Sequence, residues 1–339
     1  MVDMPGALAV GDFVEVPDDL VLTQPGWTLF SFDLANDVAV FVDIGADTDL
    51  AAAPFSYHRQ YEQAKRVLRM PMSAFLELAE KAPAAPTLVH LINIGHCGST
   101  LLHNVFNASG QGWCLSEPLF TFDLAMNRAA LPADRLAALW RAAMRMLRVM
   151  VPPESAHKAL IVKHFSQITA ILPAVHASEP DATFLYLTRH AEAWCNSLFG
   201  FHQRLGGLLD LSPTDRFFSW KMMSGNTDPA YLGGHVDMAA ANVTFDRLAA
   251  MAWRLHRARF DSAVAAGMPL NIVRYEPLLA NPQADLERLF AICGMDAGGI
   301  APGMTAFAAD SHEGSATAHS RPVAALSPEA LDRIRNVVG

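Results

Sequence analysis

From residue 87 onward, short apolar segments alternate with segments of helical periodicity, and this alternation limits the possible folds more than any other feature of the chain. Five apolar runs, which we expect to be strands, read "TLVHLINI", "WCL", "ALIVKH", "TFLYLT" and "LNIVRY". Helical patterns fall between them, at residues 99–107, 132–150, 167–176, 191–199 and 244–266. Nearly continuous apolar strands separated by helices are typical of a parallel sheet with helices on both faces. The sequence therefore predicts an α/β fold, with ligands bound beyond the carboxyl ends of the strands.

The first part of the chain has a different pattern. Within residues 10–49, short apolar runs such as "WTLFSF" and "VAVFVDI" alternate with turn residues, and we expect a few β-strands there, as an appendage or an extension of the main sheet. Residues 57–81 have helical spacing, in a helix that Pro71 kinks or divides. "KAPAAP" follows as a separator. We therefore predict an N-terminal β-rich segment with a helix over residues 1–84 and an α/β domain over residues 85–339.

Composition excludes several classes of protein. Of the 339 residues, 52% are hydrophobic and 17% charged, which is typical of a globular chain, and the net charge of -9 argues against a nucleic-acid partner. No apolar run reaches the ~20 residues of a membrane span, and the N-terminus lacks the pattern of a signal peptide. We therefore expect a cytoplasmic protein without a membrane span. No CxxC pair occurs among the four cysteines, which argues against a disulfide framework and a zinc site: Cys97, Cys114, Cys195 and Cys293.

The segment "INIGHCGSTLL" follows the first strong strand as a phosphate-binding loop would. Gly95 and Gly98 stand in the turn, and Ser99 and Thr100 begin the next helix, whose free N–H groups and partial positive charge suit an anion. The ATPase loop G-x-x-x-x-G-K-[ST] would begin with glycine where Asn93 stands and would have lysine where Ser99 stands. As an ATP or GTP site the loop is degenerate. Taken alone, it is equally compatible with an ordinary strand-to-helix turn that uses Gly for geometry and Ser or Thr as caps.

Together with later segments, the loop resembles that of the sulfotransferases that use 3′-phosphoadenosine 5′-phosphosulfate (PAPS). Their 5′-phosphosulfate loop reads like P-[KR]-[SA]-G-[ST]-[ST]-[LW]. "GHCGSTL" matches it at Gly98, Ser99, Thr100 and Leu101, with His96 in place of the usual Lys or Arg. Bacterial sulfotransferase-like proteins and the protein-tyrosine sulfotransferase branch are the most similar. The resemblance implies a P-loop-type parallel sheet flanked by helices, with a small β-rich N-terminal extension. It assigns six loop residues to the cofactor site: His96, Cys97, Gly98, Ser99, Thr100 and Leu101.

Four further segments match the family in the same order. "FLYLTRHAEAWCNSLFGF" provides Arg189 and, eight residues later, Ser197, which the resemblance assigns to the 3′-phosphate, although His190-Ala191 replaces the usual Asp-Pro or Asp-Gly. An arginine fork and a neutral hydroxyl donor suit phosphate oxygens. The remaining segments resemble a strand ending in a site lysine, an adenine-side tyrosine and a cofactor-covering C-terminal segment, and they assign Lys163, Tyr275 and Arg321. The resemblance covers residue 87 to the C-terminus; residues 1–86 have no usable family pattern.

The resemblance implies transfer of a sulfuryl group to a hydroxyl or amine acceptor by in-line displacement, without a metal. Lys163, assisted by His96, is expected to stabilise the transition state. Glu117 in "GWCLSEPLF" is the candidate general base, because it lies 21 residues after His96, a spacing similar to that in the tyrosine-sulfotransferase branch. The alternative role for Glu117 is to cap the following helix. The acceptor would be a small molecule or a glycan or peptide hydroxyl.

Two other functions stay open at this point. An ATP-dependent small-molecule kinase shares the sheet and the loop, but requires lysine at Ser99. A non-catalytic nucleotide-binding relative is compatible with His96 and with the missing Asp-Pro after Arg189. The identity of the acceptor and the oligomeric state have no signature in the sequence. Residues 121–150 and 205–243 are expected to form the acceptor walls, the second as a turn-rich lid.

Replacing His96 tests the assignment of the loop. We expect His96→Lys to retain or improve binding of adenosine 3′,5′-bisphosphate, because a permanent charge replaces an imidazole that titrates near neutral pH. Calorimetric titration at pH 6 and pH 8 measures this, and the wild type alone should lose affinity at the higher pH. A complete loss of binding in His96→Lys would show that the loop is misassigned.

Overall fold

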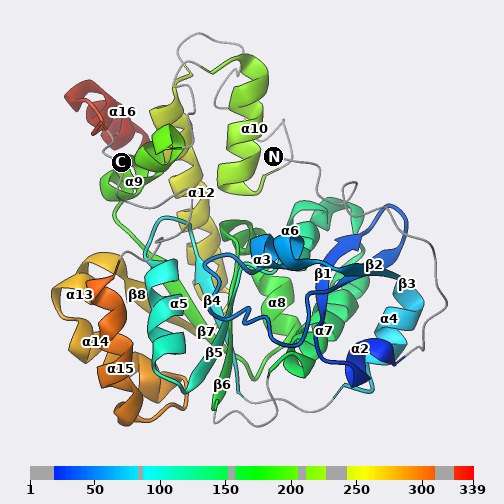
Figure 1. Ribbon diagram of the computed structural model, residues 1–339. Coiled ribbons are helices and arrows are strands. Elements are labelled where there is room, and N and C mark those ends of the chain that lie inside the picture. Colours follow the sequence, from blue (N-terminus) through cyan, green and yellow to red (C-terminus); the bar gives the residue numbers. More distant parts are fainter. Residues whose placement is uncertain (1–18, 83–86, 152–156, 205–210, 227–242, 310–323) are drawn as a thin grey trace.

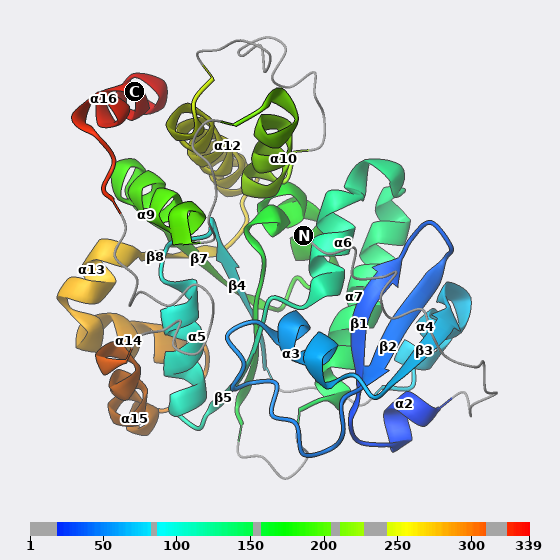
Figure 2. The same cartoon turned by 45° about the horizontal axis from the view of Figure 1, so that its top comes forward.

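The computed structural model describes residues 19–82, 87–151, 157–204, 211–226, 243–309 and 324–339. Within them the chain forms a three-stranded antiparallel sheet, of order β1-β2-β3, and a five-stranded parallel sheet, of order β5-β6-β4-β7-β8 (Figure 1). In both views the small sheet lies beside helices α6 (Leu119–Met126) and α7 (Ala133–Val149), which separate it from the parallel sheet (Figures 1 and 2). The predicted α/β class, with a parallel sheet flanked by helices and a β-rich N-terminal extension, is confirmed.

All five strands predicted after residue 87 are present. Those of the parallel sheet are β4 (Thr87–Asn93), β5 (Gly112–Ser116), β6 (Ala159–Lys163), β7 (Thr183–Thr188) and β8 (Leu270–Arg274). The small sheet contains β1 (Trp27–Asp33), β2 (Val38–Asp43) and β3 (Arg66–Pro71).

Helices occupy most of the remaining described chain. Before the parallel sheet they are α2 (Leu20–Thr23), α3 (Ser56–Gln63) and α4 (Met72–Ala79). Within and after it they are α5 (Ser99–Ala108), α6 (Leu119–Met126), α7 (Ala133–Val149), α8 (Leu172–Ser178), α9 (Ala191–Arg204), α10 (Pro213–Ser224), α12 (Phe245–Ala265), α13 (Tyr275–Ala280), α14 (Pro282–Ile292), α15 (Ile300–Met304) and α16 (Pro328–Val338). Short 3₁₀ turns are η1 (Arg128–Ala130), η2 (Ser166–Ile171), η3 (Ala297–Gly299) and η4 (Thr305–Ala308). None of the described helices is both long and apolar enough to cross a membrane.

The parallel sheet is covered on both faces, which explains why its strands are apolar throughout. On one face His90 of β4 contacts Trp140 of α7, with ring centroids 5.7 Å apart. On the other, Phe106 of α5 packs against Phe290 of α14 at 6.0 Å. Because alternate residues of each strand enter these two layers, no strand has a polar face.

The register of the sheet gathers the carboxyl ends of its strands at one edge. Lys163, the last residue of β6, is paired with Leu91 of β4 and with Ser116, the last residue of β5. On the other side Thr188 ends β7 opposite Arg274, which ends β8. The residues that follow these strands therefore meet at the same edge, as the ligand-binding rule for open parallel sheets requires.

The helix predicted over residues 57–81 is wrong in its middle. Only α3 and α4 are helical, and between them Arg66–Pro71 forms β3, which pairs with β2. Ion pairs fasten this edge strand, because the Nη2 atoms of Arg66 and Arg69 lie 2.6 Å from carboxylate oxygens of Asp43 and Asp33 respectively. Pro71 ends the strand and precedes α4, a position where its missing N–H costs no ladder bond. Long-range pairing thus overrides the local helical spacing.

The small sheet is fastened to the α/β part through α6. The Phe32 N–H donates to Asp123 Oδ2 at 2.9 Å, and the Phe32 ring packs against Phe120 at 5.8 Å. Burial raises the pKa of Asp123 to about 7; the Phe32 hydrogen bond opposes this shift, and the Asp33 charge adds to it. Since Asp123 lies six residues after Glu117, this contact ties the N-terminal sheet to the helix that leaves the predicted site.

The raised pKa of Asp123 predicts a pH-dependent contribution to stability. The protonated carboxyl is favoured in the folded chain, so this contribution is present below pH 4 and is lost as the pH rises to about 7. Asp123→Asn keeps an oxygen acceptor for Phe32 and removes the charge. Its unfolding free energy relative to wild type should rise by roughly 1–3 kcal/mol between pH 4 and pH 8.

Urea unfolding at several pH values measures this difference. The matched control is Asp134→Asn, an exposed acid at the start of α7, which should differ from wild type by the same amount at every pH. A pH-independent difference for Asp123→Asn would contradict the prediction.

Candidate active site

The loop between β4 and α5 has a strained backbone. Gly95 and Gly98 have φ values of 75° and 86°, and His96 between them has φ 47°, in the left-handed region that residues with a side chain rarely adopt. Ser99 begins α5, and its N-cap Gly98 provides no side-chain oxygen to the first turn. The first N–H groups of α5 therefore have no partner within the helix, and the loop presents them as an anion site would.

The loop is held in this shape through its carbonyl oxygens. Trp194 Nε1 of α9 donates to Ile94 O at 3.1 Å and to Gly95 O at 2.7 Å, and Arg189 Nη1 donates to His96 O at 3.0 Å. Three successive carbonyls are thus bound by side chains that follow β7. This fixation compensates for the strain at His96. At the start of α5 the Ser99 N–H is hydrogen-bonded to the Cys97 sulfur, and the N–H groups that follow it are placed for a ligand.

Arg189 and Tyr275 meet at the same loop, although they are 86 residues apart. The Arg189 guanidinium carbon lies 4.3 Å from the centroid of the Tyr275 ring. A Cβ atom on Gly98 would lie 2.5 Å from Tyr275 Cδ2, so only glycine fits beneath the ring. Arg189 Nε is buried and has no hydrogen-bond partner among the described residues; Glu276 Oε1 lies 4.0 Å away. A partly exposed arginine with a buried, unpaired Nε beside a loop of this shape is a candidate anion ligand.

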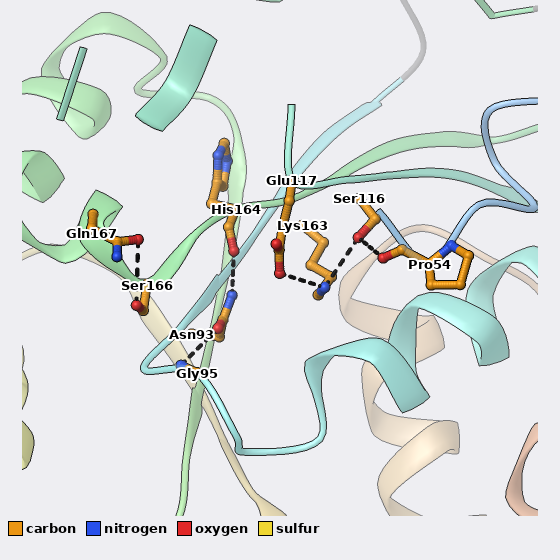
Figure 3. A network of polar contacts seen from close by, with 9 residues as sticks. All are labelled: Pro54, Asn93, Gly95, Ser116, Glu117, Lys163, His164, Ser166 and Gln167. Carbon is orange, nitrogen blue, oxygen red and sulfur yellow. Dashed lines mark hydrogen bonds and ion pairs between the residues drawn. The ribbon is translucent and has the colours of Figure 1, made fainter. Parts of the chain in front are cut away.

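Lys163 and Glu117 form a nearly buried ion pair at the ends of β6 and β5. Lys163 Nζ lies 2.7 Å from Glu117 Oε1 and 3.0 Å from Ser116 Oγ, and the side chains of Lys163 and Glu117 are 1% and 17% exposed (Figure 3). Glu117 has φ 54°, and its N–H donates to Lys163 O at 2.7 Å. A base candidate and a cation candidate are thereby placed in direct contact.

The alternative role of Glu117 as a helix cap does not match this geometry. Helix α6 begins at Leu119 with Pro118 as its N-cap and with no side-chain hydrogen bond there. The Glu117 carboxylate instead binds Lys163.

Asn93 links this pair to the loop. Asn93 Oδ1 accepts from Gly95 N at 2.8 Å, and Asn93 Nδ2 donates to His164 O at 2.5 Å (Figure 3). The turn after β4 is therefore hydrogen-bonded to the residue that follows Lys163, which fixes the distance between the phosphate-type loop and the ion pair.

A cavity of about 680 Å³ opens on the side of the loop that faces α9 and α10. Gly95, His96 and Ser166 border it, and its other walls are mainly apolar side chains of α9, α10 and α12: Trp194, Leu198, Phe201, Met222, Met223 and Phe245. Its size and its mainly apolar lining are typical of small-molecule sites.

The structure brings most of the predicted site residues to this edge, in different ways. Ser99 and Thr100 begin α5 and are 6% exposed. Cys97 and Leu101 point into the core, so these two can offer a ligand only their backbone; burial raises the pKa of Cys97 to about 12. Ser197 lies on the face of α9 that also carries Trp194.

Of the two remaining predicted residues, the structure describes His96 but not Arg321. The His96 ring packs edge-on against Phe201, with centroids 4.9 Å apart, and borders the cavity. Arg321 lies outside the described residues, as does most of the expected lid over residues 205–243. Among the described residues, no group of three or more His, Cys, Asp or Glu side chains is arranged to hold a metal ion.

Sequence reasoning missed the segment before α3. Ser116 Oγ donates to Pro54 O at 2.5 Å (Figure 3). The Phe55 ring centroid lies 5.2 Å from Lys163 Nζ. Neither residue belongs to a motif, and both precede the part of the chain that resembles a known family. Only the folded chain reveals them.

Of three comparisons with known proteins, the one with solved structures found matches. No protein-family model and no curated protein matches the sequence. Among solved structures seven chains match, including the crystal structure of sulfotransferase STF9 from Mycobacterium avium. The match has 14% identity and a TM-score of 0.45, and covers 85% of this chain and 86% of that chain. At this identity the likeness is remote.

Gly98→Ala tests the contact between the loop and Tyr275. Any side chain at φ 86° costs roughly 1 kcal/mol, and here the new Cβ also displaces the Tyr275 ring. The matched control is Gly110→Ala, with φ 68° and no atom within 4 Å of the new Cβ. We expect both variants to lose a similar small stability from strain, and Gly98→Ala alone to bind adenosine 3′,5′-bisphosphate at least about tenfold more weakly. Equal affinities in calorimetric titration would contradict the contact.

Proposed function

We propose that the chain transfers a sulfuryl group from PAPS to a hydroxyl or amine acceptor. The observation that carries this proposal is the Lys163–Glu117 pair, 2.7 Å apart, which is joined through Asn93 to an anion-type loop without an ATPase lysine. A cation, a carboxylate base and a phosphate cradle are the groups that such a transfer needs.

The residues present fit the proposed donor. The N–H groups at the start of α5 and the hydroxyls of Ser99 and Thr100 would hold the 5′-phosphosulfate. Arg189, with its incompletely paired Nε, and Ser197 would bind the 3′-phosphate, and Tyr275 would contact the adenine. Arg321 stays a predicted phosphate ligand.

Glu117 and Lys163 would perform the proton and charge chemistry. When bound, the donor supplies the sulfuryl group to the acceptor atom and leaves as adenosine 3′,5′-bisphosphate once the bond from sulfur to the bridging oxygen breaks. Glu117 would take the proton of the acceptor hydroxyl or amine, and Lys163 would stabilise the negative charge that develops on the bridging oxygen. Their ion pair orients both groups beforehand.

The cavity beside His96 and Ser166 is the proposed place for the body of the acceptor. It borders the loop at Gly95 and lies on the side of α9 and α10, whereas Tyr275 contacts the loop at Gly98. Donor and acceptor would thus approach from different sides of the same turn. His96, which borders the cavity, would stand between them and assist Lys163 if protonated.

Ligand binding and turnover test the proposal in sequence. We expect adenosine 3′,5′-bisphosphate to raise the melting temperature, corresponding to about 2.7 kcal/mol at one hundred times its Kd, and ATP to raise it less. Turnover is then measured with labelled donor on a panel of phenols, alcohols, sugars, peptides and amines. Glu117→Gln should lower kcat at least about a hundredfold and leave bisphosphate affinity nearly unchanged, because the base acts only in the chemical step.

Glu77→Gln is the matched control, since Glu77 is an exposed acid on α4 and should retain wild-type kcat. Stabilisation by ATP alone would contradict the proposed donor and favour a kinase. Bisphosphate binding without turnover on the whole panel would favour a non-catalytic relative.

A further inference from the structure

The segment from Ala51 to Pro54 runs along edge strand β5 toward the candidate site. Asn107 of α5 anchors its start, because Nδ2 donates to Ala51 O at 2.6 Å while Oδ1 accepts from Cys114 N of β5 at 2.8 Å. Ser116 anchors its end through the 2.5 Å hydrogen bond to Pro54 O. The same Ser116 oxygen lies 3.0 Å from Lys163 Nζ (Figure 3). The segment is therefore fastened at both ends to the parallel sheet, and one fastening is shared with the ion pair.

Beyond Pro54 the chain places two aromatic rings beside the ion pair. The Phe55 ring lies 5.2 Å from Lys163 Nζ and 6.2 Å from the Tyr57 ring, and Tyr57 packs against Phe165 at 5.5 Å. Phe122 of α6 extends this series at 5.3 Å from Phe165. All four rings are half-buried, so the series reaches the surface. We call these four residues the aromatic wall: Phe55, Tyr57, Phe165 and Phe122.

The Lys163 ammonium depends on its few neighbours, because it is 1% exposed. An ammonium has three N–H donors; Glu117 and Ser116 accept from two of them. The Phe55 ring is a further neighbour, and an aromatic face attracts a cation most strongly where water is excluded. Loss of that face would admit water beside Nζ and loosen its position against Glu117.

We propose that Phe55 is a positioning residue of the reaction site, which holds the Lys163 ammonium against Glu117 and shields it from water. This inference rests on the proposed sulfuryl transfer. It places part of the site in the N-terminal segment over residues 1–84, outside the part that resembles sulfotransferases, so that segment and the α/β part depend on each other for activity.

Tyr57 does not compete with Glu117 as the base. Burial and the Glu117 charge both raise the pKa of the Tyr57 phenol, so it stays protonated. Within the aromatic wall it can donate a hydrogen bond but cannot take the acceptor proton.

The test compares ring and aliphatic side chains at Phe55. Phe55→Leu keeps apolar bulk and removes the ring face, and should lower kcat about tenfold with bisphosphate Kd and donor KM within twofold of wild type. Phe55→Tyr restores the face and should restore kcat. The matched control is Tyr61→Leu, the same kind of change one helical turn beyond Tyr57 on α3, which should retain wild-type kcat. Equal kcat values for Phe55→Leu and Tyr61→Leu, or no recovery in Phe55→Tyr, would overturn the proposal.

Amine acetylation followed by mass spectrometry tests the shielding without turnover. Lys163 should react several-fold faster in Phe55→Leu than in wild type, Phe55→Tyr or Tyr61→Leu, while exposed Lys81 reacts equally in all four. An unchanged rate at Lys163 would overturn the shielding role. Turnover in wild type and in Lys163→Met separates the levels of the proposal. No turnover in wild type contradicts the proposed function, and wild-type kcat in Lys163→Met contradicts the role of Lys163. Loss of activity in Lys163→Met with full activity in Phe55→Leu contradicts only the role of Phe55.

Discussion

The ion pair of Lys163 and Glu117 sets the geometry on which the rest of the candidate site depends. A buried ammonium is costly unless it is paired and hydrogen-bonded, and here both conditions are met at the junction of two strands. The register of β5 against β6 places Ser116 opposite Lys163, and the Glu117 N–H donates to Lys163 O. Main-chain pairing thus fixes where both side chains begin. A one-residue slip would send Lys163 to the opposite face of the sheet and leave Glu117 without its partner.

Backbone strain occurs both in the loop after β4 and at the ion pair. His96 and Glu117 both have left-handed backbones, which cost on the order of 1–3 kcal/mol each and persist only where neighbours enforce them. At His96 the enforcement comes from Trp194 and Arg189, which bind the loop carbonyls. At Glu117 it comes from the Lys163 carbonyl and ammonium. The strained backbone orients the Glu117 side chain at one turn and the N–H groups at the start of α5 at the other.

The sequence predicted those elements whose structure depends on nearby residues. The strands after residue 87 could be found because a strand buried on both faces is continuously apolar, and the loop because glycine and hydroxyl residues have turn and cap preferences. The strand Arg66–Pro71 could not be predicted in this way, because it forms by pairing with β2, more than twenty residues away. Phe55 could not either, because its contact with Lys163 joins positions more than a hundred residues apart without a motif. Whether Arg321 joins the site stays a prediction.

The proposed phosphate cradle lacks the ATPase lysine, and the proposed function depends on cations that lie elsewhere. Ser99 takes the position of that lysine, and the His96 ring packs against Phe201 at the cavity. Two cations instead come from the ends of the strands that flank β4: Lys163 is the last residue of β6, and Arg189 directly follows β7. A cation on the loop would move with the loop, whereas cations on β6 and β7 are fixed by the sheet. In the proposed reaction the sheet therefore carries the charge stabilisation, and the loop contributes oriented N–H groups.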